Sequence, residues 1–200
     1  MVRQTHSRRV VDAQDLLRAA SNAAAGERVQ GDGIVSGPDG PFLAVGVGDC
    51  APLYLADLRT GAYALLHSGW RGTGILRRAV ERLVHEYESN PEDLVVTIGP
   101  CISADAYVVD DERASEYARW GRDAVVYRGD RPYLDMRAAN ARIARELGVG
   151  PRTERMEHEG LQAGLDRGGS FGVGRGGGRH RGRSARHRSA NRNAAELRAG

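Results

Sequence analysis

The pattern of apolar and polar residues predicts four α-helices along the chain. The clearest stretch is 75–87, where the apolar side chains recur about every 3.6 residues and so share one face. Residues 10–25 are rich in alanine and leucine and are followed by a glycine, which predicts a first helix. Two more helices are expected over 110–120 and 136–147.

Shorter apolar runs between these helices predict β-strands. The runs are 31–35, 43–47, 52–55, 62–66 and 94–98. The sequence Asp-Leu-Arg-Thr-Gly at 57–61 has the composition of a hairpin turn between two of them. Because strands and helices mix without a regular βαβ repeat, an α+β domain is expected.

The alternation of apolar and polar residues ends near Asp166. Residues 168–188 are rich in glycine, arginine and serine and cannot bury enough apolar surface to offset the entropy of ordering. We therefore expect a folded domain over 1–155 and a disordered, low-complexity tail over 156–200. The tail resembles either an RNA-binding arginine-glycine segment or the product of a frameshift near residue 155, and the second interpretation is favoured.

Charge and composition narrow the class of protein. Residues 166–200 contain nine arginines and two acidic residues, so the preceding part of the chain is mildly acidic although the whole chain has a net charge of +3. Nucleic acid is therefore not expected as a partner. The sequence contains no apolar run long enough for a membrane helix and no signal peptide, so a cytoplasmic protein is expected. The two cysteines are too few for a disulfide scaffold.

One segment, His67-Ser-Gly-Trp-Arg-Gly-Thr73, carries candidate chemistry. It places an imidazole at the end of an expected strand and an arginine in the turn that follows. Arg71 offers a planar set of donors for a phosphate or a substrate oxygen. Considered alone, His67 could instead cap the turn, and Trp70 could be a core residue.

Five motifs together resemble a known family. They are Gln4-Thr-His6, Gly31-Asp-Gly33, Gly48-Asp-Cys-Ala-Pro52, His67 to Gly72, and Gly99-Pro-Cys-Ile102 with Tyr107. In order and spacing they are similar to the motifs of the laccase-domain family, also called multicopper polyphenol oxidase-like. Its members are understood as purine nucleoside phosphorylases and are also described as peptidoglycan editing factors. The resemblance implies a layered α-β-β-α sandwich with mixed sheets.

The resemblance also implies a site and an activity. His6, Cys50 and His67 would bind one Zn²⁺, a set of borderline-soft ligands that leaves a fourth position open. Cys50, His67, Arg71 and Asp49 are the candidate catalytic residues. The expected reactions are phosphorolysis of adenosine, inosine, guanosine and methylthioadenosine, and deamination of adenosine. The expected partners are purine nucleosides and phosphate, and the expected assembly is a monomer or a homodimer.

Three alternatives remain open. Cys50 and His67 could form a nucleophile and base that hydrolyse an amide in peptidoglycan precursors. A polyphenol oxidase would require copper redox chemistry, but the sequence shows no blue-copper cluster of two histidines, a cysteine and an axial methionine. The third alternative is an inactive fragment. Relatives carry a longer segment before Gln4-Thr-His6 and a closing arginine-rich motif, so this chain is interpreted as truncated at both ends.

Overall fold

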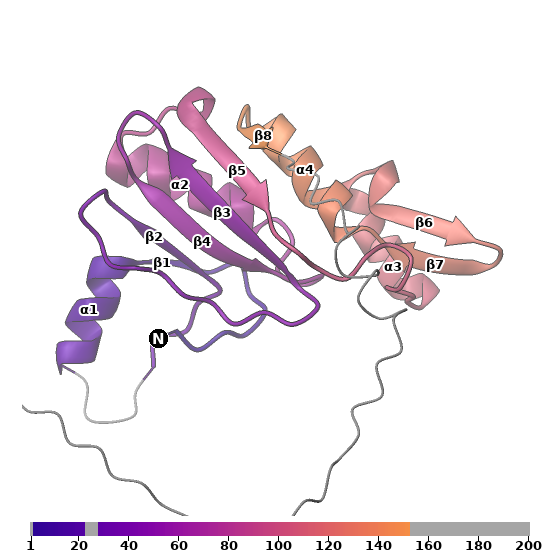
Figure 1. Cartoon of the computed structure of the whole chain (residues 1–200). Coiled ribbons are helices and arrows are strands. Elements are labelled where there is room, and N and C mark those ends of the chain that lie inside the picture. The colour runs from indigo at the N-terminus through magenta and orange to yellow at the C-terminus, as the bar shows by residue number, and fades with distance from the viewer. Residues whose placement is uncertain (1, 23–27, 153–200) are drawn as a thin grey trace, which may run out of the picture. The chain divides into compact units, whose positions relative to one another are not determined.

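A six-stranded mixed sheet forms the centre of the fold in the computed structural model, which describes residues 2–22 and 28–152 (Figure 1). The strands of this sheet are β1 (Val10–Asp12), β2 (Gly33–Ser36), β3 (Ala51–Asp57), β4 (Tyr63–Ser68), β5 (Leu94–Ile98) and β8 (Gly150–Arg152). Their order across the sheet is β1-β2-β4-β3-β5-β8. The two outermost pairs are parallel and the inner three are antiparallel.

Two helices, α2 (Ile75–Tyr87) and α4 (Met136–Glu146), pack against one face of this sheet, and α2 lies behind the strands in Figure 1. Alternate residues of each strand point to this face, because side chains in a strand alternate between the two sides. Leu53 on β3 and Leu66 on β4 are fully buried there, and Leu76 and Leu83 on α2 pack against the same core. The neighbours of the buried strand residues must therefore point to the other face.

The opposite face is covered at its β1–β2 end by α1 (Ala13–Asn22) and by the first residues of the chain. Val11 and Ile34 point to this side, where Val2 and Ala13 join them in a second buried cluster. The chain segment that precedes β1 is thereby fixed against the sheet, on the face opposite α2. This placement matters because the segment contains His6.

A third cluster of buried residues lies beyond the sheet. It is formed by α3 (Asp111–Tyr117), the start of α4 and a two-stranded ribbon of β6 (Val125–Arg128) and β7 (Arg131–Leu134). Short 3-10 turns at Pro91–Asp93, Ala118–Trp120 and Arg122–Ala124 complete the described elements. Tyr117, Leu134 and Met136 are the largest fully buried side chains of this cluster.

Several expectations from the sequence are confirmed. The helix at 75–87 and the strand at 94–98 have the expected bounds, and the expected strands at 31–35, 52–55 and 62–66 correspond to β2, β3 and β4. The predicted hairpin turn is stabilised by the Asp57 carboxylate, which accepts hydrogen bonds from the backbone N–H groups of Arg59 (2.8 Å) and Thr60 (3.0 Å). The fold is α+β with mixed sheets, as expected.

Other expectations were wrong. Residues 10–12 form a strand instead of the start of a helix, because Val10 and Val11 pair with β2 and bury both side chains. Residues 43–47 are irregular, and their exposed neighbour Phe42 and the half-exposed Val47 show that this run does not enter the core. The ribbon β6–β7 and strand β8 were not predicted. The proposed tail, residues 156–200, lies outside the described residues.

Candidate metal centre

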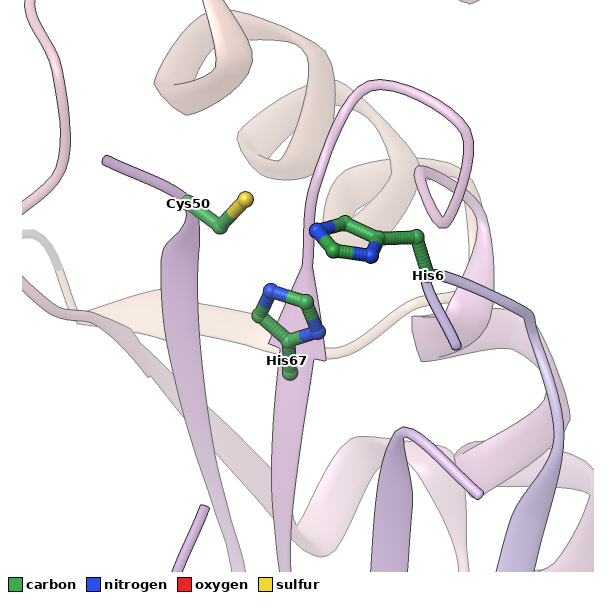
Figure 2. Close-up of side chains that lie close together, drawn as sticks. All are labelled: His6, Cys50 and His67. Carbon is green, nitrogen blue, oxygen red and sulfur yellow. The ribbon is translucent and has the colours of Figure 1, made fainter. Parts of the chain in front are cut away.

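His6, Cys50 and His67 come together from three separate parts of the chain (Figure 2). Their potential ligand atoms all lie within 4.8 Å of one another. The two imidazole rings are in edge contact, with centroids 4.8 Å apart and an interplanar angle of 72°. His67 is buried, Cys50 is half-buried and His6 is exposed, so the group is open to solvent on the His6 side.

The register of β3 and β4 explains why Cys50 and His67 meet. Pro52 is paired with His67 across the antiparallel strands, so the start of β3 lies beside the end of β4. Leu66 and Ala51 point into the core under α2, and therefore His67 and Cys50, their neighbours in sequence, point to the opposite face. That is the face on which the His6 segment lies.

The His6 segment is held by the carboxylate of Asp32. Three successive backbone N–H groups donate to it, those of Thr5 (3.2 Å), His6 (2.9 Å) and Ser7 (2.7 Å). This wrapping turns the backbone of His6 into the left-handed region, at φ 57°. Such a conformation is uncommon for a residue other than glycine and needs support from its surroundings.

The same carboxylate orients His67. The Nδ1 atom of His67 lies 2.9 Å from Asp32 Oδ1, and both side chains are buried. Burial raises the pKa of Asp32, but the hydrogen bonds from Ser7, His67 and the backbone outweigh it and hold that pKa at about 2. Asp32 is thus ionised at neutral pH, and its carboxylate is the acceptor for a proton on His67 Nδ1, which leaves Nε2 for the other side chains of the site.

The geometry and the donor types fit a tetrahedral metal ion. Two imidazole nitrogens and one thiolate suit Zn²⁺, and bond lengths of about 2.0–2.3 Å place ligand atoms about 3.5 Å apart around the ion. The present separations, all within 4.8 Å, require only a small contraction to reach this value. Three protein ligands would leave one position for water or substrate.

Buried hydrogen bonds hold the turn that follows His67. The Thr73 hydroxyl lies 2.9 Å from the Gly69 carbonyl oxygen and 3.0 Å from the phenolic oxygen of Tyr117. On the core side of β4, the Ser68 hydroxyl donates to Asn140 Oδ1 of α4 at 3.2 Å. These buried contacts connect the end of β4 and the turn with α3 and α4. They therefore restrict the movement of the backbone at His67.

The two other predicted site residues are neighbours of this group in sequence: Asp49 precedes Cys50, and Arg71 lies in the turn after His67. Asp49 is exposed and its negative charge contributes to raising the pKa of the Cys50 thiol, after the larger effect of burial. The guanidinium of Arg71 lies over the ring of Trp70, 5.1 Å from its centroid, and is exposed. Neither side chain belongs to the cluster of potential metal ligands.

Two residues near the site were not anticipated. Asp32 was recognised only as part of a motif, although an aspartate between two glycines next to a strand was a signal that a carboxylate is enclosed there. Arg113 of α3 lies over the Trp70 ring at 4.8 Å, so two arginines contact the same indole. Nothing in the sequence around Arg113 distinguishes it from a solvated helix residue. The other cysteine, Cys101, packs against the core.

Comparison with curated proteins identifies relatives with known names. The chain is 36% identical over 124 residues to a purine nucleoside phosphorylase of Deinococcus radiodurans, a match that covers 60% of this chain and 49% of the relative. It is 31% identical over 156 residues to adenosine deaminase RL5 of an unknown prokaryotic organism, covering 74% of this chain and 60% of the relative. The chain thus spans only about half to three fifths of these relatives.

Solved structures and a family model agree with these matches. The fold is similar to that of YlmD from Geobacillus stearothermophilus, with a TM-score of 0.66 and 26% identity, covering 75% of this chain and 60% of that one. The family model described as multi-copper polyphenol oxidoreductase laccase matches residues 1–167. Because this match extends over most of the sequence, the chain belongs to the multi-copper polyphenol oxidoreductase laccase family.

Proposed function

We propose that this chain carries the metal centre of a purine nucleoside phosphorylase that also deaminates adenosine, with His6, Cys50 and His67 as ligands of one Zn²⁺. The observation that carries the proposal is the convergence of these three side chains, with their ligand atoms within 4.8 Å of one another. The names of the relatives from Deinococcus radiodurans and of RL5 support the two reactions. We propose residues 1–155 as the domain that contains this centre.

Zinc is the metal that the donor set favours. A bound Zn²⁺ would polarise a coordinated water or substrate oxygen, which is the chemistry that a deamination requires. A blue-copper site needs a weak axial ligand, commonly methionine, beside two histidines and a cysteine. The described residues contain one methionine, Met136, and its side chain is buried in the cluster formed by α3 and α4. The copper alternative therefore has less support.

Phosphorolysis further requires groups that hold a phosphate and manage a proton. We assign the phosphate contact to Arg71, because its guanidinium is exposed in the turn that follows His67 and lies over the Trp70 ring. A guanidinium keeps its positive charge at all relevant pH values, so it can bind both ionised forms of phosphate. Asp49 adjoins Cys50 and is the candidate for accepting or donating a proton near the purine.

The alternative of a Cys50–His67 amide hydrolase uses the same pair without a metal. Its support is the proximity of the two side chains. However, burial and the nearby Asp49, Cys101 and Asp32 raise the pKa of the Cys50 thiol, whereas a nucleophilic cysteine needs a lowered pKa. Moreover, His6 joins the pair, which a nucleophile and its base do not require but which a metal ion would use as a third ligand. The metal centre is thus the better supported of the two.

The decisive experiment measures product release and metal content in one preparation. The full chain is loaded with zinc and incubated with inosine or adenosine and phosphate, and hypoxanthine, adenine and inosine are separated by chromatography. We expect one zinc per chain, and loss of both zinc and product in Cys50→Ser. Cys101→Ser is the matched control, because it removes the other half-buried thiol without removing a proposed ligand.

Three results would overturn the proposal. A folded, zinc-loaded protein that releases none of these products would exclude the assigned reactions for this chain and would favour the inactive fragment. Amide hydrolysis that survives complete removal of metal would favour the cysteine nucleophile instead. Phenol oxidation that depends on copper would support the polyphenol oxidase alternative.

A further inference from the structure

Asp32 makes more polar contacts than any other carboxylate near the proposed metal centre, and its side chain is fully buried. Its Oδ1 atom faces two groups, the backbone N–H of His6 and the Nδ1 atom of His67, each at 2.9 Å. Its Oδ2 atom accepts from the Ser7 hydroxyl (2.6 Å) and from the backbone N–H groups of Ser7 and Thr5. The two proposed histidine ligands are thus joined through a single oxygen atom.

The burial of a charged group at this position calls for a reason. Removing a carboxylate from water is costly unless hydrogen bonds or an opposite charge compensate it. Here the hydrogen bonds from Thr5, His6, Ser7 and His67 supply that compensation. A Zn²⁺ ion held by a Cys50 thiolate would have a net charge of +1, which the Asp32 carboxylate would neutralise through the His67 ring. The position of this carboxylate is therefore suited to a metal-loaded site as well as to holding the backbone of residues 5–7.

We infer that Asp32 is a positioning residue that aligns both His6 and His67 before the metal binds; this inference rests on the proposed metal centre. Toward His6 it acts on the backbone, because the left-handed conformation at φ 57° is maintained by the N–H groups of Thr5, His6 and Ser7 pointing at one carboxylate. Toward His67 it acts on the ring, because an acceptor at Nδ1 selects the tautomer whose Nε2 lone pair is free to bind.

Asp32→Asn tests this role, because an amide cannot accept hydrogen bonds on both of its polar atoms. Asp57→Asn is the matched control: Asp57 is also buried and also accepts backbone N–H groups, but it lies at the far end of β3 from Cys50. Zinc affinity is measured by competition with a chromophoric chelator, and folding is monitored by circular dichroism. We expect the affinity to fall about 10–100-fold in Asp32→Asn and to be unchanged in Asp57→Asn.

Two further measurements separate positioning from a general loss of stability. With Co²⁺ in place of zinc, the visible absorption bands should shift in Asp32→Asn, because the geometry of the ligands changes. In the metal-free protein, the ¹⁵N shifts of His67 should report a proton on Nδ1 in the wild type and a mixture of tautomers in the variant. Ser7→Ala, which removes the hydroxyl contact to Oδ2 together with the acceptor of the Arg9 backbone N–H, should weaken zinc binding less than Asp32→Asn does.

The outcomes distinguish this inference from the proposed function. If the wild-type chain binds no metal, the metal centre itself is refuted. If the wild type binds zinc and a folded Asp32→Asn binds it equally well, with the same cobalt spectrum and the same His67 tautomer, the inference about Asp32 alone is overturned. If Asp32→Asn does not fold, Ser7→Ala decides: weaker zinc binding supports the inference, and unchanged binding contradicts it.

Discussion

Gly69 lies directly against Cys50, with no room between them for a side chain. A Cβ atom at residue 69 would be 2.9 Å from the Cys50 sulfur and 3.2 Å from Cδ2 of His6. Real Cβ atoms do not approach other heavy atoms this closely, so a substitution must displace one of the proposed ligands. The glycine in the turn after His67 is thus required by close approach.

Gly69→Ala is therefore expected to disturb metal binding more than folding. The cysteine and His6 would be pushed apart, and zinc affinity should fall about 10-fold or more, since small displacements of ligands weaken a preorganised site. Gly48→Ala is the control, because a Cβ there meets nothing within 4 Å although residue 48 is only two positions from Cys50. Chelator competition on both variants checks this; equal affinities would show that the site tolerates the methyl group.

The buried Thr73 hydroxyl should contribute to stability through two partners. Thr73→Val leaves both the Gly69 carbonyl oxygen and the Tyr117 hydroxyl without a hydrogen bond, and should lower the free energy of unfolding by about 2–3 kcal/mol. Tyr117→Phe removes only the second contact, so about 1 kcal/mol is expected. Urea denaturation of both variants measures the difference. A larger loss in Tyr117→Phe than in Thr73→Val would contradict this assignment.

Gly74, which precedes α2, combines a special conformation with a close contact. Its φ is +98°, and a Cβ would lie 2.5 Å from the Trp120 ring. Gly74→Ala should therefore cost about 1–2 kcal/mol in backbone strain and about 1–3 kcal/mol more from overpacking. Gly148→Ala has a similar φ of +71° with nothing within 4 Å, so it should show the strain alone. Thermal and urea denaturation compare the two; equal losses would mean that Trp120 moves aside without cost.

Asp57 should make stability depend on pH in the acidic range. Burial raises the pKa of this carboxyl, but the nearby Ser89 hydroxyl and the hydrogen bonds from residues 59 and 60 lower it to about 2. Because the pKa in the unfolded chain is about 3.9, the ionised form stabilises the fold above that pH, and this stabilisation is lost as pH falls toward 2.

Asp57→Asn should thus lower the free energy of unfolding by about 1–2 kcal/mol at pH 7 and by progressively less toward pH 2. Denaturation curves at a series of pH values between 7 and 2.5 measure this convergence. Asp39→Asn, at an exposed position, serves as the control and should leave the curves unchanged. A constant difference between wild type and Asp57→Asn at all pH values would be inconsistent with this origin.

The sequence predicted an element well where the periodic apolar stretch was long and was followed by a residue that ends it. The helix Ile75–Tyr87 was predicted with its bounds because its apolar face is continuous and Asn90-Pro91 prevents any extension. Short elements were missed because pairing with distant strands decides them. Val10 and Val11 form a strand only because β2 lies beside them, and β8 is defined by its parallel pairing with β5.

The residues of the candidate site that lie in recognisable sequence motifs could be predicted, and the others could not. His6, Cys50 and His67 were predicted together from such motifs, and the structure places them together. The acceptor role of Asp32 could not be derived, because it depends on how the backbone of residues 5–7 curves around the carboxylate. Likewise, the contact of Arg113 with Trp70 arises from the packing of α3, which no local pattern reveals.

Two adjacent polar residues of strand β4 point to opposite faces of the sheet. His67 faces the ligand cluster, and Ser68 faces Asn140 of α4. Slippage of this strand by one position relative to β3 would exchange them, because every side chain would move to the other side of the sheet. An imidazole would then enter the aliphatic interior, and a hydroxyl would replace it in the cluster. A chain with β4 in the wrong register would therefore be unstable and would also lack the ligand cluster. The packing of the core thus also ensures that His67 lies beside His6 and Cys50.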